Sequence, residues 1–481
     1  MALRLHNTLS RALEDVQPRN PPKITVYVCG PTVYDEPHIG HARSAFVFDV
    51  LRRYLAYKKY EVMFVRNVTD VDDKIIEKAK QEVTTSPGHK VTGDLNAACR
   101  EVAERYLASY HAAMDRLGIG RPDIEPRATE HVVPGMTDLI ARLLVQGVAY
   151  EAGGDVYFAV RKWPGYGKLS NRTPDELKAG ARVEPGERKQ DPLDFALWKA
   201  AKPGEPQWES PWGRGRPGWH IECSAMSTQY LGDAFDLHGG GVDLVFPHHE
   251  NEIAQAEAAG QPFARHWVHH GLLTVDGEKM SKSLGHFITV EQALAASPHP
   301  DYLKLLFLKT HYRSPIDYVP GKMAEARKNW QEFSRFFQHC DQRGGRGTSG
   351  REMTSRLPNL LEAFNDAMDD DLNTPRAVSV LFELVNLGHQ ALESPGAEAA
   401  ALADYVHATL LECGMALGLF LQGASEEPPQ TLERVLARIA ERDAARKAKQ
   451  FQRADEIRRG LAQEGVLLSD TANGTFWRRV R

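Results

Sequence analysis

The hydrophobic and polar positions change their period repeatedly along the first part of the chain. An apolar, β-branched run from Ile24 to Val28 predicts a buried strand. After a Cys-Gly-Pro stop at residues 29–31, apolar residues recur at helical spacing from Phe46 to Tyr54. A second strand is predicted at residues 60–68 and a long helix at residues 96–117. This alternation predicts an α/β domain built on a parallel sheet.

Polar residues stand where these elements end, which is where open α/β sheets bind ligands. Cys29 follows the first strand, and Thr69 follows the second. His38 and His41 fall in the first turn of the helix after the first strand. A helix start offers free N–H groups to anions, and two imidazoles there could hydrogen-bond a phosphate. These positions predict an anion site at one edge of the sheet.

The pattern of predicted secondary structure changes at about residue 118, where short strands and many turn-forming residues begin. Sheet-like and helical segments resume near residue 218, which indicates an insertion into the α/β domain. Beyond residue 285 the chain is mainly helical, with linkers rich in Gly, Ser or Pro at 341–350 and 422–430. We therefore expect six parts: residues 1–118 and 218–285 as the two halves of the α/β domain, 119–217 as the insertion, 286–340 as a following segment, 351–421 as a helical bundle and 430–481 as a small terminal domain.

Length, charge and cysteine usage narrow the class of protein. A chain of 481 residues exceeds one compact core. It has no apolar run approaching 18 residues, so we expect no membrane span. Five widely spaced cysteines do not make a disulfide framework, which favours the cytoplasm. We also expect a monomer, because no extra association segment is evident.

The charge of the chain is unevenly distributed. Residues 430–481 carry twelve Lys and Arg against seven Asp and Glu, although the whole chain has a net charge of −5. A basic tail can bind a phosphate backbone, but it can equally be the solvated face of a helix. Five residues fit both interpretations: Arg434, Arg438, Arg442, Arg446 and Lys447.

Four residues could form a metal site. Cys29 and Cys223 both fall at predicted element ends, and His248 and Glu252 are four apart, so a helix would present both on one face. Thiol, imidazole and carboxylate are ligand types that zinc accepts. His249 competes with His248, but only His248 has Glu252 four residues later. The alternative is that the two distant cysteines are simply buried thiols.

A nucleotide-binding site in this protein would have to lack the common nucleotide-binding motifs. Neither a P-loop nor a strand-placed Gly-x-Gly-x-x-Gly is present. Phosphate contacts would have to come from the His38 and His41 turn and from a polar loop that holds Lys279 and Lys282. Each is weak alone, since such a loop is often just solvated and such a His pair often only caps a helix.

Together these two segments are letter for letter the two signatures of class I aminoacyl-tRNA synthetases: His38–His41 and Lys279–Ser283. The surrounding segments closely resemble the cysteinyl-tRNA synthetase family, and the resemblance covers essentially the whole chain. It is carried by these segments: Tyr27–Tyr34, Asn67–Lys74, Gly218–Met226, Phe246–Glu252, Met368–Arg376, Ala454–Arg458 and Asp470–Trp477.

The resemblance implies a Rossmann-type catalytic domain split by a connective insertion. It further implies a segment at 286–340 that contacts the tRNA stem, a helical bundle and an anticodon-binding domain at 430–481. The implied activity is that of a cysteine–tRNA ligase. ATP, accompanied by Mg²⁺, activates L-cysteine to cysteinyl-adenylate, and the 3′-terminal ribose of tRNA(Cys) accepts the cysteinyl group.

The resemblance also implies roles for individual residues. One Zn²⁺ would be held by Cys29, Cys223, His248 and Glu252 and would read the substrate thiolate, so no editing domain is expected. The other implied roles are catalysis for His38, His41, Lys279 and Lys282, nucleotide binding for Gly240, Gly241, Asp243 and Lys282, and substrate binding for Gly30, Thr69 and Trp219. For Trp219, packing alone is an open alternative.

Two other functions remain as alternatives at this point. A ligase that joins activated cysteine to an amino sugar would share the two signatures, but it would have no use for the bundle and the basic terminal domain. An RNA-binding regulator without catalysis would have no need for intact signatures. Both are less consistent with the sequence than a tRNA ligase.

Overall fold

The structure is a computed structural model. It describes residues 2–85, 95–178, 188–279, 287–297, 299–343, 356–421, 429–471 and 474–479.

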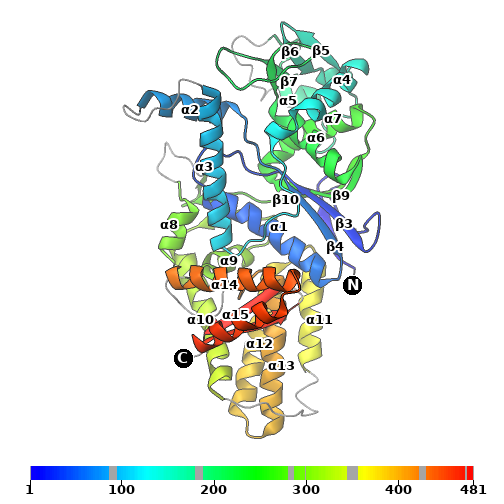
Figure 1. Ribbon diagram of the computed structural model, residues 1–481. Coiled ribbons are helices and arrows are strands. Elements are labelled where there is room, and N and C mark those ends of the chain that lie inside the picture. Colours follow the sequence, from blue (N-terminus) through cyan, green and yellow to red (C-terminus); the bar gives the residue numbers. More distant parts are fainter. Residues whose placement is uncertain are drawn as a thin grey trace.

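A parallel sheet of four strands lies near the middle of the molecule (Figure 1). Every neighbouring pair in it is parallel. Its strands, in spatial order, are β10 (Phe263–His270), β9 (Ala234–Gly241), β3 (Lys23–Val28) and β4 (Glu61–Arg66). Ile24, Val26, Leu237 and Trp267 are at most 1% exposed, as expected for a sheet that is covered on both faces. This confirms the predicted fold class.

The order of the strands reverses between β3 and β9. Helix α1 (Ile39–Tyr57) leads from β3 to β4 on one side, whereas α6 (Trp219–Leu231) precedes β9 on the other. Helix α7 (Glu250–Ala258) then leads from β9 to β10. Ligands of open α/β sheets bind at the carboxyl ends of strands at such a reversal. The fold therefore directs attention to the residues that follow β3 and β9.

The insertion forms a second sheet of its own, at the top of Figure 1. It is antiparallel, with β5 (Ala149–Ala152), β6 (Asp155–Phe158), β7 (Phe195–Ala200) and β8 (Gly215–Pro217) in that order. The helices α4 (Thr137–Val145) and α5 (Pro174–Lys178) belong to the same part of the chain. Beside it stands a helical arm of α2 (Asp73–Thr85) and α3 (Leu95–Arg116), which pack on each other through a small apolar cluster.

Two small sheets were not predicted from the sequence. The first is a hairpin of β1 (Arg4–Asn7) and β2 (Ala12–Asp15). The second joins β12 (Glu278–Lys279), β11 (Leu273–Val275) and β13 (Ile316–Tyr318). Strands of two to four residues are too short for a period to be visible in the sequence.

Beyond residue 286 the described chain is mainly helical, apart from β13 and the last two strands. The aromatic stripe Trp330, Phe333, Phe336 and Phe337 is at most 2% exposed, which confirms that it is core. The remaining helices are α8 (Val290–Ala295), α9 (Asp301–Leu308), α10 (Pro320–Arg343), α11 (Arg356–Asp369), α12 (Thr374–Glu393), α13 (Ala397–Ala416), α14 (Pro429–Lys447) and α15 (Phe451–Gln463). A hairpin of β14 (Val466–Thr471) and β15 (Gly474–Arg479) closes the chain.

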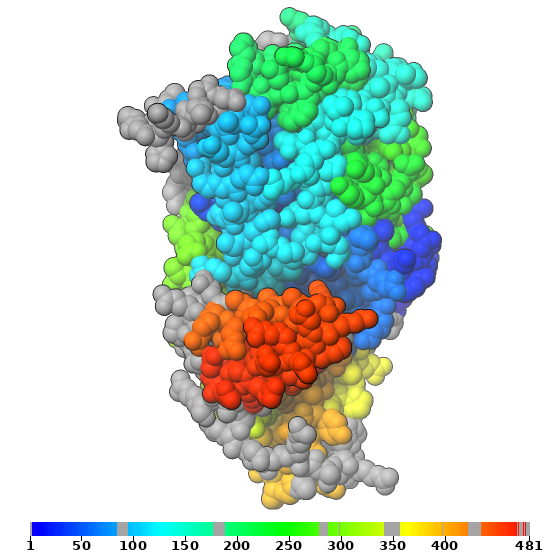
Figure 2. Space-filling view, in the orientation of Figure 1, coloured from blue at the N-terminus to red at the C-terminus, as the bar shows by residue number. Residues whose placement is uncertain are grey.

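The C-terminal helices, orange to red in Figure 2, lie on the surface in front of the bundle. Arg434 and Arg438 pair with Glu464, and Arg442 and Arg446 pair with Asp470, so these side chains brace the terminal part internally. Among the described residues, none of the helices is long and apolar enough to cross a membrane. The six domain boundaries stay predictions.

Candidate active site

A compact buried cluster lies at the reversal point of the sheet. The Sγ atom of Cys29, directly after β3, is 3.4 Å from Cys223 Sγ and 3.3 Å from Glu252 Oε1. His248 Nε2 is 3.1 Å from the same carboxylate oxygen. The four ligand atoms all lie within 4.8 Å of one another, and all four residues are buried. The structure thus brings together the four residues that were predicted to form a metal site.

The local elements explain this convergence. Cys29 is carried by the end of a central strand, and Cys223 by the second turn of α6. His248 lies in the turn Val245–His249, and Glu252 lies in the first turn of α7. Because that turn runs directly into the helix, the spacing of four residues keeps both side chains on one face.

A second set of ligand atoms overlaps the first. Cys29 and Glu252 also lie within 4.8 Å of His238 and His249. His238 Nε2 is 2.8 Å from Glu252 Oε2, and His249 Nε2 is 3.3 Å from Cys29 Sγ. His248 and His249 thus each belong to one of two overlapping sets of ligand atoms.

Burial determines the charge state of the cluster. It raises the pKa of both thiols, Cys29 and Cys223, and lowers the pKa of His248 and His249 well below the usual value. The ion pairs of Glu252 are with imidazoles alone among the described residues, with no Lys or Arg. Glu252 is fully buried, and a bound cation would offset the cost of burying its carboxylate.

The first signature forms the start of α1. His38 is the N-cap residue, and its Nδ1 accepts hydrogen bonds from the backbone N–H groups of Gly40 (3.1 Å) and His41 (3.3 Å). His41 Nδ1 in turn accepts from the His38 N–H at 3.3 Å. Since both Nδ1 atoms are acceptors, both neutral rings carry their proton on Nε2. The rings stack with centroids 3.7 Å apart.

This arrangement differs from the sequence-based expectation in one respect. We expected free backbone N–H groups at this helix start, but the first ones are already engaged. The Ile39 N–H donates to Ile288 O at 3.1 Å, and those of Gly40 and His41 are capped by His38. The donors that this helix start can offer an anion are therefore the two imidazole Nε2–H groups. Burial lowers the pKa of His38 to about 4, so the ring is neutral at neutral pH.

The segment that follows the second signature is bound to the first. The Val290 N–H donates to Pro37 O at 2.8 Å, and the Phe287 ring packs edge-on against His38 at 5.3 Å. Lys279 ends β12, and its backbone pairs with Thr274. Lys282 and the rest of the loop, residues 280–286, lie outside the described residues. Phe287 and Val290, which follow the loop in sequence, thus contact His38 and Pro37.

The predicted nucleotide-binding residues lie at the end of β9. A Cβ at Gly240 would lie 2.7 Å from His249 Cε1, and one at Gly241 would lie 2.5 Å from Asp243 Oδ1. A side chain at Gly240 would thus collide with the buried His249 ring, whereas the atom nearest Gly241 is the end of the exposed Asp243 side chain. Asp243 is exposed and is close enough to His38 to act electrostatically on its imidazole. The nucleotide-binding role of these residues stays a prediction.

The three predicted substrate-binding residues surround the same cluster. A Cβ at Gly30 would lie 1.6 Å from Asn67 O, so only glycine fits between the ends of β3 and β4. Thr69 is buried and donates from Oγ1 to Glu222 Oε2 at 2.7 Å. Trp219 is 38% exposed and packs on His248 with ring centroids 4.1 Å apart. An indole that is this exposed lies at the open side of the cluster rather than in the core.

Several residues at the site were missed from the sequence. His220 Nδ1 is hydrogen-bonded to His248 Nδ1 at 2.8 Å, and His269 Nε2 to His249 Nδ1 at 2.7 Å. Together with His238 and Glu222 they form a second layer around the cluster. Such partners usually fix the orientation of metal ligands. The unusual density of histidines within and beside the predicted strands was the feature that could have revealed them.

Comparison with known proteins decides the family. A model described as "tRNA synthetases class I (C) catalytic domain" matches residues 15–328, and a DALR domain model matches residues 363–422. Relatives named "Cysteine--tRNA ligase" from Geobacter metallireducens and Geobacter sulfurreducens are each 46% identical over 499 aligned residues, with 99% of this chain and 100% of each relative covered. The chain belongs to the cysteine–tRNA ligase family.

Solved structures support the same fold at greater distance. The methionyl-tRNA synthetase of Mycobacterium tuberculosis in complex with methionyl-adenylate aligns with a TM-score of 0.61 at 15% identity. The alignment covers 86% of this chain and 93% of that one. The family and fold predicted from the sequence are therefore confirmed for this cysteine–tRNA ligase family member.

Proposed function

We propose that this chain is an enzyme that attaches L-cysteine to the 3′-terminal ribose of tRNA(Cys) with ATP as the energy source. The observation that carries the proposal is the position of the thiol-rich cluster. It lies at the reversal point of the sheet, at the end of the strand that leads into the His38–His41 turn. A site for sulfur recognition and a site for phosphate chemistry thus share one edge of the sheet.

The donor set fits a zinc ion bound by Cys29, Cys223, His248 and Glu252. Two thiols, an imidazole and a carboxylate are ligand types that zinc takes, and their atoms already lie within 4.8 Å of one another. The overlapping set with His238 and His249 contains one thiol only, so it suits zinc less well. When bound, the zinc ion would favour the thiolate of cysteine over the hydroxyl of serine. Such direct recognition makes a separate editing site unnecessary.

His38 and His41 would act on the phosphates of ATP. The carboxylate of cysteine attacks the α-phosphorus, and the bond to the pyrophosphate oxygen breaks. Negative charge then develops on the phosphate oxygens, and the two Nε2–H groups can donate hydrogen bonds to them. Each neutral ring already carries a proton on Nε2, so it can donate a hydrogen bond without first being protonated. Lys279 and Lys282 would hold the departing pyrophosphate, with Mg²⁺ accompanying ATP, while Gly240, Gly241 and Asp243 would hold the adenosine.

The residues around the cluster would position the amino acid. Trp219 covers the open side next to His248, so it can form one wall of a small pocket. The buried hydrogen bond from Thr69 to Glu222 fixes the threonine side chain at the same place. Gly30 allows the ends of β3 and β4 to approach closely. A site bounded by these three residues would favour the small cysteine side chain over larger ones.

The helical part of the chain, beyond β13, supports a tRNA substrate rather than a small amine. The chain continues through a bundle, α11 to α13, into a terminal part with an excess of basic residues. An amino-sugar acceptor would not need that length of protein. None of the five cysteines, all of which the structure describes, forms a disulfide, as expected for a protein of translation that acts in the cytoplasm. We propose that the enzyme acts as a monomer.

Two reactions run side by side test the proposal. ATP–pyrophosphate exchange with cysteine measures activation, and transfer of labelled cysteine to tRNA measures charging. We expect both with the metal-loaded protein, and we expect the loss of charging after chelation, with recovery when zinc is restored. Exchange without charging would favour the small-amine ligase, and neither activity in a folded, metal-loaded sample would overturn the enzyme proposal.

Matched cysteine variants test the metal site itself by elemental analysis. Cys223→Ala should lose the bound zinc, because a ligand is removed. Cys413→Ala is the control, since this thiol is equally buried but lies in the bundle, in α13. Equal zinc content in the two variants would contradict the proposed ligand set.

A further inference from the structure

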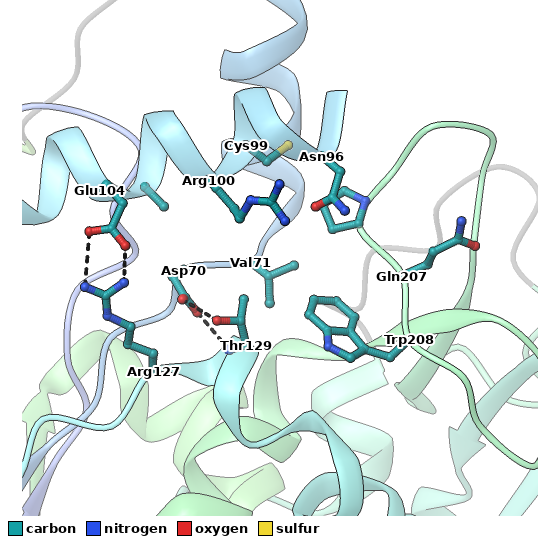
Figure 3. Close-up of a pocket in the computed structure, with 12 residues that line it drawn as sticks. Asp70, Val71, Asn96, Cys99, Arg100, Glu104, Arg127, Thr129, Gln207 and Trp208 are labelled. Atoms are coloured by element: carbon teal, nitrogen blue, oxygen red, sulfur yellow. Dashed lines mark hydrogen bonds and ion pairs between the residues drawn. The ribbon is translucent and has the colours of Figure 1, made fainter. Parts of the chain in front are cut away.

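A pocket lies between the helical arm and the insertion, and none of the four cluster residues lines it. It has a volume of 310 Å³, at the lower end of the range of ligand sites. Figure 3 shows α3 on one side of it, with Arg100, and the loop before β8 on the other, with Trp208. Asp70 and Val71 line it between them. None of its lining residues was assigned a role above.

One charged group in this pocket is unpaired. Asp70 accepts hydrogen bonds from the Thr129 N–H (2.9 Å) and the Thr129 hydroxyl (2.6 Å). Glu104 and Arg127 form an ion pair with each other. Arg100 is exposed, and among the described residues it makes neither a hydrogen bond nor an ion pair. Its guanidinium is therefore the group with which the pocket can bind an anion or a hydrogen-bond acceptor.

The opposite wall offers an aromatic surface. Trp208 is held by backbone hydrogen bonds to Gly215 of β8, from Trp208 N to Gly215 O at 2.7 Å and in return at 3.1 Å. Its indole is half-buried, and none of the described aromatic rings stacks on it. A fixed backbone and a ring without an aromatic partner are the features of a stacking platform for a base.

The charge of the lining restricts the ligand. Arg100 and Arg127 are balanced by Asp70 and Glu104, so the lining has no net positive charge. A free nucleotide with several phosphates would need an excess of positive charge. A base within a nucleic-acid strand needs less, because it can stack on Trp208 and place one phosphate at Arg100.

The position of the pocket indicates which nucleic-acid strand it binds. Asp70 follows Thr69 directly, so the two Cα atoms are about 3.8 Å apart. Thr69 is hydrogen-bonded to Glu222, the residue before Cys223 in the cluster. The pocket thus begins one residue away from the proposed cysteine site, which the 3′ end of the tRNA has to reach for charging.

We infer that this pocket binds one unpaired nucleotide of the 3′ strand of tRNA, upstream of the terminal adenosine. The base stacks on Trp208, and its phosphate pairs with Arg100. This inference rests on the proposed function, since it takes tRNA as the substrate. It assigns to the arm and the insertion the task of holding the end of the tRNA while the last ribose reaches the adenylate.

Activation and charging separate the inference from the proposed function. Trp208→Ala and Arg100→Ala should leave cysteine-dependent pyrophosphate exchange unchanged, because exchange needs no tRNA. The kcat/KM for tRNA in the charging reaction should fall by about 5- to 140-fold for Trp208→Ala, the usual effect of removing one stacking partner. Trp208→Phe should restore most of it. Arg100→Ala should reduce the slope of log affinity against log salt by about 0.7, the value for one phosphate of a single strand.

Arg105→Ala is the matched control. Arg105 lies on the same helix and carries the same charge, but it pairs with Glu82 away from the pocket. Its replacement should leave charging and the salt slope unchanged. An equal loss with Arg105→Ala would mean that general electrostatics is responsible, which would overturn the inference.

A modified substrate locates the nucleotide. An abasic residue is placed at each unpaired position of the 3′ end in turn, and one position should show no further loss with Trp208→Ala. Additive losses at every position would refute stacking on Trp208. Unchanged charging in both pocket variants, or a parallel loss of exchange, would also overturn the inference. Absence of exchange and charging in the wild type would instead be the failure of the proposed function.

Discussion

Two replacements of His38 separate the two tasks that its imidazole performs. Nδ1 caps α1 by accepting the N–H groups of Gly40 and His41, whereas Nε2–H is available to the phosphates of ATP. Asn is a good N-cap residue, because its side-chain oxygen can accept the same N–H groups, but it lacks an imidazole N–H. Ala provides neither function.

The expected magnitudes follow from this division. His38→Ala should lose about 1 kcal/mol of stability, the usual cost of an N-cap, while His38→Asn should stay within about 0.5 kcal/mol of the wild type. Both variants should lose a transition-state hydrogen bond, which costs about 100- to 1,000-fold in kcat. The KM for ATP should change much less, since the bond strengthens as charge develops.

Urea denaturation and ATP–pyrophosphate exchange measure the two effects separately. An Asn variant with nearly full exchange activity would refute the role of the imidazole N–H in catalysis. An Asn variant as unstable as the Ala variant would refute the capping role of Nδ1. His41→Asn is a useful companion, because His41 Nδ1 accepts the His38 N–H at 3.3 Å and completes the capping box.

Three further predictions concern stability. Burial lowers the pKa of His38 from 6.5 to about 4, so as the pH falls the unfolded chain takes up this proton first. The free energy of unfolding of the wild type should therefore fall as the pH is lowered from 6.5 to about 4. This fall should exceed that of His38→Asn by at most about 3 kcal/mol. Equal urea-denaturation curves for the two proteins across this pH range would contradict the lowered pKa of His38. Gly30→Ala should prevent stable folding or abolish activity, because its Cβ would lie 1.6 Å from Asn67 O. The control is Gly321→Ala, whose Cβ would have no atom within 4 Å, and thermal denaturation should show that it is as stable as the wild type or slightly more stable. Asp371→Asn should cost about 2 kcal/mol in urea denaturation, because the buried carboxylate accepts hydrogen bonds from Tyr312 Oη and Arg313 Nε. The control is its half-buried neighbour Asp370, which pairs with Arg4, and Asp370→Asn should cost less than about 1 kcal/mol.

The elements with a long apolar period were predictable from the sequence alone. The strand from Ile24, the helix that contains Phe46 and the aromatic stripe at Trp330 all occur where their pattern indicated. A run of buried β-branched residues or a repeated apolar face is a local property, because each residue is next to the partner that defines the period. The hairpin of β1 and β2 was missed for the opposite reason, since its four-residue strands are stabilised by contacts with distant segments, such as His6 N–H to Asp371.

The residues of the site also fall into those that could be recognised from the sequence and those that only the fold brings together. The two signatures and the pair His248 and Glu252 could be recognised from letters and spacing. The convergence of Cys29 with Cys223, 194 residues apart in sequence, depends on the parallel pairing of β3 with β9 and on the packing of α6. Sequence separation of this size contains no distance information, so only the folded sheet could bring the two thiols to 3.4 Å.

The histidines around Glu252 and the pocket at Arg100 also required the tertiary structure. His238, His249 and His269 lie on two strands and an intervening turn, and their hydrogen bonds form across the sheet. Arg100 and Trp208 belong to the arm and the insertion, which approach each other only after the chain has folded. The sequence by itself thus determined the family, the fold class and the ligand types, because these depend on patterns of residues that are close together in the sequence. The tertiary structure decided which side chains share a site, because burial and hydrogen bonding between distant segments exist only in the folded chain.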